Sequence, residues 1–126
     1  KSDRLWKIKL ARESIGAYSF PKKFDKKWQV ILKRLEKGDE SNLKLAVIEA
    51  DKLFDNLLLK MGYHGSDMAE RLKLMTPAQL TNLEEIWQAH KIRNRIVHQV
   101  DYKLRFEETE KAISAYEKAF KELLVL

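Results

Sequence analysis

The feature that most constrains the fold is a long stretch in which apolar residues recur with the spacing of one helical face. Between residues 41 and 61 these apolar positions are Leu43, Ala46, Val47, Ala50, Leu53, Phe54, Leu57, Leu58 and Met61. Because an α-helix repeats about every 3.6 residues, positions three and four apart lie on one side of it. The stripe is wide enough to contact several neighbours, so we predict a central core helix that begins at Ser41 and ends before Gly62.

Other segments carry the same periodicity, and several have residues that favour helix ends. Asp25 is suited to begin a helix and Gly38 to end it, while Asp67 with Glu70 three residues later has the pattern of a capping box. A further helix is expected to start at Thr76-Pro77, because Pro fits the first helical turn. The predicted helices cover residues 2–16, 25–37, 41–61, 67–74, 82–98 and 106–124.

The composition agrees with a helical protein of one domain. The 126 residues include 4 Gly, 2 Pro and no Cys, with 44% hydrophobic and 35% charged residues. So few turn-forming residues argue against a β-sandwich, and the lack of Cys excludes a disulfide framework or a thiolate metal site. No stretch approaches the roughly 18 consecutive apolar residues of a membrane span. We therefore predict an all-α protein, an antiparallel bundle of four to five helices formed by residues 24–126.

The whole chain has a formal net charge of +6, and its positive charge is concentrated in the amino-terminal third. Residues 1–37 hold 12 Lys or Arg against 4 Asp or Glu, whereas residues 38–126 hold 13 against 15. We define residues 1–23 as a basic amino-terminal extension. Such an extension suits nucleic acid or an anionic membrane surface, and it equally suits a solvated face that binds nothing.

The helix over residues 82–98 carries polar side chains where its pattern favours apolar ones. With about 100° per residue, His90 and Asn94 fall in the middle of its main apolar face, while Arg93 and His98 lie on opposite margins of that face. A guanidinium can hold a phosphate through its planar donors, and an imidazole can move a proton near neutral pH. These residue types near one helix end therefore indicate binding or cleavage of a phosphodiester.

A purely structural role explains the same residues without a ligand. Buried polar groups are costly unless they are hydrogen-bonded, so Asn94 would bond a neighbouring backbone group. Arg93 would pair with one carboxylate of the long helix: Glu49, Asp51 or Asp55. The functional interpretation has a geometric difficulty, because Arg93 and His98 are about 140° apart on a regular helix. They meet only through the length of Arg93, through fraying of the last turn, or across a dimer.

The run Arg93-Asn94-Arg95-Ile96-Val97-His98 resembles the Arg-x(4–6)-His motif of HEPN domains (higher eukaryotes and prokaryotes nucleotide-binding), with Asn94 in the polar second place. The predicted bundle resembles the small all-α fold of this family over roughly four-fifths of the chain. Residues 46–55 and 86–98 are also similar to an uncharacterised bacterial branch of the superfamily. Members of that branch often carry an amino-terminal membrane anchor. By that resemblance the basic extension is juxtamembrane, and the membrane is reached only through a segment preceding Lys1.

The resemblance implies a chemistry and a set of site residues. Active HEPN ribonucleases need no metal or other cofactor, and they usually form their cleft at a symmetric homodimer. By this resemblance the catalytic residues are His98 as general base or acid, Arg93 as stabiliser of the phosphate charge, and Asn94 as an orienting group. The candidate substrate-binding residues are Arg95, His90 and Asp51.

The leading hypothesis from the sequence is a metal-independent, homodimeric endoribonuclease that cleaves RNA to 2′,3′-cyclic phosphate ends. We expect it in the cytoplasm or at the cytoplasmic face of the membrane, with an antitoxin or another protein as a candidate partner. The alternative hypothesis is a non-catalytic HEPN-like module that binds a nucleotide, RNA or a protein partner. A third hypothesis is an unrelated helical bundle in which Arg93 and His98 have structural roles.

Overall fold

Five helices make up residues 20–124, the part of the chain that the computed structural model describes. No strand occurs in this range, so the prediction of an all-α bundle is confirmed. The helix predicted over residues 2–16 and most of the basic extension lie outside the described residues. In chain order the helices are α2 (Lys22–Lys37), α3 (Glu40–Lys60), α4 (Met68–Leu72), α5 (Leu83–His98) and α6 (Phe106–Leu124).

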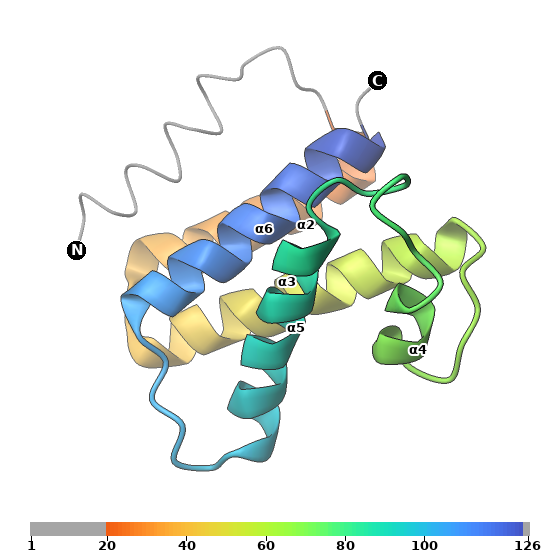
Figure 1. The fold of residues 1–126 in the computed structure, drawn as a ribbon. Helices are drawn as coiled ribbons and strands as arrows, with labels where there is room; N and C mark the ends of the chain where they lie inside the picture. The colour runs from red at the N-terminus through yellow and green to blue at the C-terminus, as the bar shows by residue number, and fades with distance from the viewer. Residues whose placement is uncertain (1–19, 125–126) are drawn as a thin grey trace.

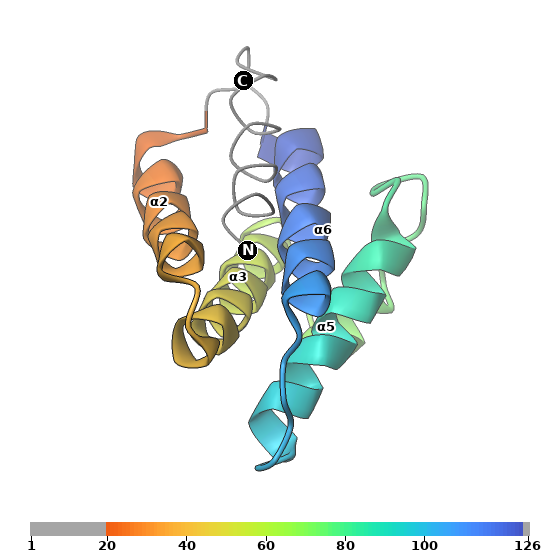
Figure 2. The same ribbon diagram turned by 90° about the vertical axis from the view of Figure 1, so that its left-hand side faces the viewer.

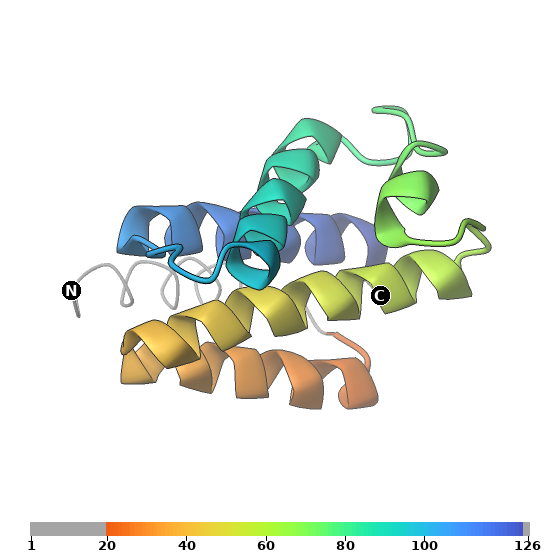
Figure 3. The same cartoon turned by 90° about the horizontal axis from the view of Figure 1, so that it is seen from below.

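The helices are arranged around α3, which contacts all four others (Figure 1). Helices α2 and α6 lie lengthwise along α3, whereas α5 crosses over α3 and α6 at a steep angle, and α4 packs near the carboxyl-terminal end of α3 (Figure 3). Figure 2 shows α2 and α5 at opposite edges of the molecule, with α3 and α6 between them. The apolar stripe therefore predicted the central helix correctly, and α2 and α5 each keep one side open to solvent.

Aromatic side chains join α2, α3 and α6 in the core. Phe24 and Trp28 of α2 stand edge-on to Phe120 of α6, with ring centroids 4.6 Å and 5.4 Å apart. Phe54 reaches the same ring from α3, with centroids 5.9 Å apart. Aromatic pairs of this kind contribute about 0.5–1.5 kcal/mol each beyond the area they bury. The cluster thus fixes the beginning of α2 against the end of α6.

Helix α2 begins earlier than the sequence pattern predicted. Pro21 occupies the N-cap position without a side-chain hydrogen bond, and Asp25 lies inside the first turn. The prediction of Asp25 as the cap was wrong, because the packing of Phe24 against Phe120 makes one more turn of helix favourable. Gly38 ends the helix with a φ of 75°, a left-handed conformation that glycine adopts without a Cβ clash.

The start of α3 also differs by a short distance from its prediction. Asp39, two residues before the predicted start at Ser41, is the N-cap, and its carboxylate accepts a hydrogen bond from the backbone N–H of Asn42 at 3.2 Å. The Asn42 side chain donates to the same carboxylate at 2.7 Å. Two donors on one acidic group make Asp39 a stronger cap than the serine.

The capping residues of α4 are those that the sequence indicated. The carboxylate of Asp67 accepts the backbone N–H of Glu70 at 2.9 Å, and the Glu70 carboxylate accepts the backbone N–H of Ser66 at 2.9 Å. The helix predicted to start at Thr76-Pro77 is absent, and residues 76–80 form a single turn in which Gln79 donates to the Thr76 carbonyl at 2.9 Å. The buried Leu80 anchors this turn in the core, and the next helix begins separately at Leu83.

Candidate functional site

A buried carboxylate, Asp51, joins the three helices α3, α5 and α6. The hydroxyl of Tyr116 in α6 donates to its Oδ1 at 2.5 Å. The Nδ1 of His90 in α5 lies 3.0 Å from Oδ1 and 3.3 Å from Oδ2, and the Nε of Arg93 lies 3.6 Å from Oδ2. We call these four residues the Asp51 cluster. Its members come from three helices, so it both ties the bundle together and fixes the position of Arg93.

The hydrogen-bond roles in the cluster follow from Asp51, because an ionised carboxylate can only accept hydrogen bonds. Nδ1 of His90 therefore carries the hydrogen that faces Asp51. Burial is the largest cause that raises the pKa of Tyr116 well above its ordinary value, and the charge of Asp51 and the hydrogen bond to it act in the same direction. Tyr116 thus stays a neutral donor, and Asp51 has partners that offset the cost of burying its charge.

Arg93 extends from this cluster toward the surface. Its side chain is 33% exposed, and its Nη1 donates to the Oδ1 of Asn94 at 3.1 Å. The guanidinium is therefore held on one side by the buried Asp51 and on the other by its neighbour in α5. Holding it this way reduces the rotamer entropy that would be lost when an anion binds the outer part of the fork.

The three carboxylates that the sequence offered to Arg93 each have their own arginine. Glu49 accepts a hydrogen bond from the Nε of Arg34 at 2.8 Å, on the side of α3 that faces α2. Asp55 accepts two hydrogen bonds of 2.7 Å from Arg71, at the carboxyl-terminal end of α4. Asp51 is the partner that remains for Arg93. The sequence left the partner of Arg93 open among three carboxylates. The packing of the other helices around α3 decides that it is Asp51.

His98 lies apart from the Asp51 cluster, exposed in the last turn of α5. The helix stays regular through His98 and ends at Gln99, whose N–H donates to the Arg95 carbonyl at 2.9 Å. No hydrogen bond or ion pair joins His98 to Arg93 or Asn94 within residues 20–124. Fraying therefore does not bring the motif together in one chain, and the side chain of Arg93 is directed to Asp51 instead.

Arg95 belongs to a second polar group, which is centred on Glu108 of α6. The Nη1 of Arg95 lies 3.9 Å from Glu108, and the same carboxylate accepts the hydroxyl of Tyr102 and the backbone N–H of Arg105. Burial opposes the ionisation of Glu108, but the hydrogen bonds from Tyr102 and Arg105 outweigh it and lower its pKa. Burial and then the Glu108 contact raise the pKa of Tyr102.

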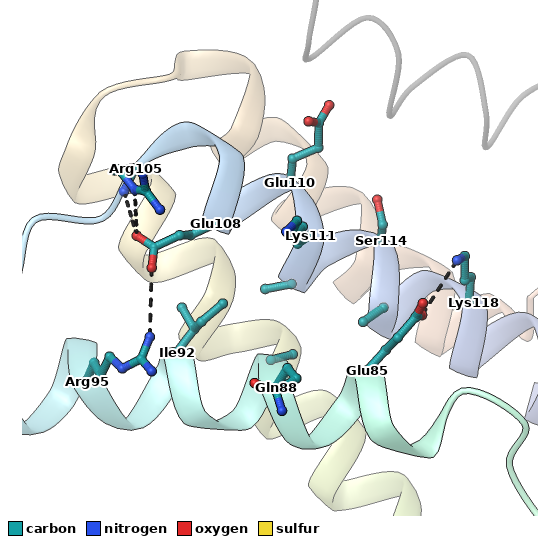
Figure 4. A pocket seen from close by; sticks show the side chains of 13 residues that line it. Glu85, Gln88, Ile92, Arg95, Arg105, Glu108, Glu110, Lys111, Ser114 and Lys118 are labelled. Atoms are coloured by element: carbon teal, nitrogen blue, oxygen red, sulfur yellow. Dashed lines mark hydrogen bonds and ion pairs between the residues drawn. The ribbon is translucent and has the colours of Figure 1, made fainter. Parts of the chain in front are cut away.

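A groove of about 720 Å³ runs between α5 and α6 (Figure 4). Its apolar floor includes Ala89 and Ile92. Five of its charged residues are paired: Glu108 with Arg95 and Arg105, and Glu85 with Lys118 at 3.5 Å. Ile92 is about 180° around α5 from the middle of the face that holds His90 and Asn94. The groove therefore lies behind the motif, and Arg95 is the one predicted site residue that lines it.

The structure brings together four of the six residues predicted from the sequence. Asp51, His90, Arg93 and Asn94 form a continuous chain of contacts, whereas Arg95 and His98 do not join it. Sequence reasoning missed Tyr116 as a member, because its position fits the apolar stripe of α6. The phenol itself was the available signal, since a buried tyrosine hydroxyl usually has a hydrogen-bond partner.

Comparison with known proteins gives no relative, since no protein-family model, curated protein or solved structure matches this chain. None of the helices in residues 20–124 is long and apolar enough to cross a membrane. In the same range, no group of three or more His, Asp or Glu side chains is placed to hold a metal ion. A functional proposal therefore depends on the geometry of α5 and the Asp51 cluster.

Proposed function

We propose that this protein is a HEPN-like endoribonuclease that acts as a homodimer through Arg93, Asn94 and His98. The observation that carries the proposal is the placement of Arg93: its Nε lies 3.6 Å from a buried carboxylate that has two further partners, its Nη1 donates to Asn94, and its side chain is 33% exposed. A phosphate site needs an accessible part of the guanidinium, and Arg93 has one. His98 lies five residues after Arg93, in the last turn of α5, and its side chain is exposed.

In the proposed reaction the 2′-oxygen of a ribose attacks the adjacent phosphorus. A P–O2′ bond forms and the P–O5′ bond breaks, which leaves a 2′,3′-cyclic phosphate and a 5′-hydroxyl. His98 removes the proton from the 2′-hydroxyl while water protonates the leaving 5′-oxygen, or it protonates the 5′-oxygen while water takes the proton of the 2′-hydroxyl. Arg93 stabilises the negative charge on the phosphate oxygens, and Asn94 keeps the guanidinium in place.

A second copy of the chain supplies the geometry that one copy lacks. Arg93 and His98 point about 140° apart on α5, so we propose that Arg93 of one copy acts with His98 of the other. Val97 and Val100 lie next to His98 and are 46% and 96% exposed. Exposed aliphatic side chains beside the motif suit a contact with the second copy.

In this proposal Asp51 and His90 act through Arg93. Both were expected to bind substrate, yet both are buried, and their polar atoms face each other. They are positioning residues. An Asp51→Asn variant should therefore lower the turnover number and change the salt dependence of RNA binding less than an Arg93→Ala variant does, because the positive charge stays on the surface.

The test is cleavage of a single-stranded RNA oligonucleotide in EDTA, followed by analysis of the product ends. We expect cyclic phosphate ends from the wild-type protein, and a loss of about 100-fold or more in rate for His98→Ala. His64→Ala is the matched control, because His64 is also exposed but lies in the turn after α3. An inactive wild-type protein, or an equal effect of both substitutions, would refute the nuclease proposal.

Mixing two inactive variants tests the contribution of the second copy. Arg93→Ala and His98→Ala proteins, mixed in equal amounts and allowed to exchange, form heterodimers with one intact composite site. Half of the dimers are then heterodimers with one of two sites working, so about a quarter of wild-type activity should return. No recovery in a mixture whose exchange has been verified would mean that each site is contained in one chain.

The second candidate function is a non-catalytic module that binds RNA or a nucleotide. The separation of His98 from Arg93 within one chain favours it, because an anchored guanidinium binds phosphate without any proton transfer. The two functions differ in one result. Tight binding that depends on Arg93 but not on His98, with no cleavage product after long incubation, would support the binding module.

A further inference from the structure

The solvent side of α2 carries a dense row of lysines, which we call the lysine face. Seven of the 16 residues in α2 are Lys or Arg and two are acidic. The lysines of this face are all exposed. They are Lys22, Lys23, Lys26, Lys27, Lys33 and Lys37.

These lysines share one side of the helix. At about 100° per residue they fall within an arc of about 140°, and four of them lie within about 60° of each other. Asp25 and Glu36 fall outside the arc, so no carboxylate of α2 interrupts it. From Lys22 to Lys37 the face is about 22 Å long. Helix α2, which carries this face, lies along one edge of the bundle (Figure 2).

The lysine face has no partner within the part of the chain that the structure describes. No hydrogen bond or ion pair links any of its six ammonium groups to residues 20–124. The one arginine of α2, Arg34, is already used: it donates to Glu49 at 2.8 Å and to Asn42 at 3.1 Å. Six like charges side by side repel one another, and their repulsion is relieved when an anionic surface is brought against them.

The residue types of this face discriminate between anionic partners. Binding of single-stranded RNA uses aromatic side chains on which bases stack, yet Trp28 is fully buried and Phe24 is packed against Phe120. Protein interfaces are enriched in Tyr, Trp and Arg and depleted in Lys. Lysine ammonium groups on flexible stems keep their hydration, which suits a surface of mobile lipid headgroups. Clusters of four to eight such residues on an amphipathic helix bind anionic lipids.

We propose that the lysine face docks this protein on the surface of an anionic phospholipid bilayer. Val30 lies within the face and is 50% exposed, so it contacts the headgroup boundary between the lysines. Beside Val30 is a hollow of about 300 Å³ between α2 and α3. Its lining includes the apolar Ile31 and Leu53, the two lysines Lys27 and Lys52, and Glu49, which is paired with Arg34. The proposal is independent of the proposed nuclease function, because α5 is at the opposite edge of the molecule (Figure 2).

Co-sedimentation of the 126-residue protein with large unilamellar vesicles tests this proposal. The vesicles contain phosphatidylcholine alone or with about 30% phosphatidylserine. We expect binding to the phosphatidylserine vesicles alone, and release when the salt is raised from about 0.05 M to about 0.5 M. Each lysine near the surface contributes about fivefold to partitioning, so K22Q/K26Q/K33Q should lower the partition coefficient by about 100-fold.

The matched control is K73Q/K91Q/K103Q, which removes the same charge from exposed lysines outside α2. It should lower partitioning by less than about fivefold, and far-UV circular dichroism should show that both triple variants are folded. Equal losses in the two triple variants would mean that net charge and not the lysine face is responsible, and would overturn the proposal. Failure of the wild-type protein to bind phosphatidylserine vesicles would also overturn it. So would a result in which the α2 variant loses affinity for an RNA oligonucleotide but keeps its affinity for vesicles.

Discussion

Replacing Tyr116 by Phe removes one hydrogen bond from the Asp51 cluster and leaves the packing unchanged. Tyr116 is fully buried, its hydroxyl donates to Asp51 at 2.5 Å, and its ring packs against Phe54 with centroids 6.2 Å apart. A hydrogen bond to a charged group contributes about 1.5–3 kcal/mol, so we expect the free energy of unfolding to fall by that amount. For a domain of this size the melting temperature should fall by about 7–14 °C.

The same substitution should change how stability depends on pH. Because the pKa of Tyr116 is raised well above 10, the folded protein keeps this proton at a pH where the unfolded chain has lost it. The contribution of Tyr116 is therefore complete below about pH 10 and declines above it, by up to about 1.4 kcal/mol per pH unit. Phe has no such proton. The difference in stability between wild type and Tyr116→Phe should thus narrow as the pH rises above about 10.

Urea unfolding followed by far-UV circular dichroism measures both effects, with m-values that should be equal for the two proteins. Tyr63→Phe is the matched control, because Tyr63 is half-buried and its hydroxyl makes no hydrogen bond to residues 20–124. It should change stability by less than about 0.5 kcal/mol. A Tyr116→Phe effect no larger than this control, or a difference that stays constant from about pH 9 to 11, would refute the reasoning about the cluster.

Other substitutions test the helix ends and the ion pair at α4. Arg71→Ala removes two hydrogen bonds of 2.7 Å to Asp55, so the free energy of unfolding should fall by about 2–3 kcal/mol. Amide hydrogen exchange in α4 should also accelerate, and unchanged exchange would contradict this expectation. Gly38→Ala places a Cβ at a φ of 75° and should destabilise by about 1 kcal/mol in urea unfolding. Hydrogen bonds from Asn42 lower the pKa of Asp39, so its stabilisation is present above about pH 4 and lost as the pH falls. In Asp39→Ala the melting temperature should therefore be lower at neutral pH and should fall less on acidification than in the wild type.

The helical layout was predictable because periodicity is a local property. The bounds of α6 and the carboxyl end of α5 at His98 agree with the prediction. The errors occur where tertiary contacts decide the outcome. Packing of Phe24 extends α2 by a turn, and the buried Leu80 keeps the segment after Pro77 a single turn. Neither contact can be read from the spacing of residues within one segment.

The candidate site was predictable in its residue types but not in its pairing. Helical geometry placed His90 and Asn94 on the inner face of α5, and the structure buries His90 and half-buries Asn94. The choice of Asp51 as the partner of Arg93 depends on the side of α3 that α5 crosses. Tyr116 joins the cluster through the position of α6 along α3, a distance of 65 residues in sequence. Tertiary packing therefore determines both the Arg93–Asp51 contact and the Tyr116–Asp51 contact.

Three of the carboxylates of α3, namely Glu49, Asp51 and Asp55, also explain why the apolar core packs in one arrangement only. The leucine-rich stripe of α3 would tolerate a slide by one helical turn, because one aliphatic side chain fills the place of another at small cost. The carboxylates are not interchangeable in this way: Glu49 must meet α2, Asp51 must meet α5 and α6, and Asp55 must meet α4. A slide of about 6 Å would separate all of these pairs together. The charged residues of α3 therefore fix the register of the bundle, while its leucines supply the stability.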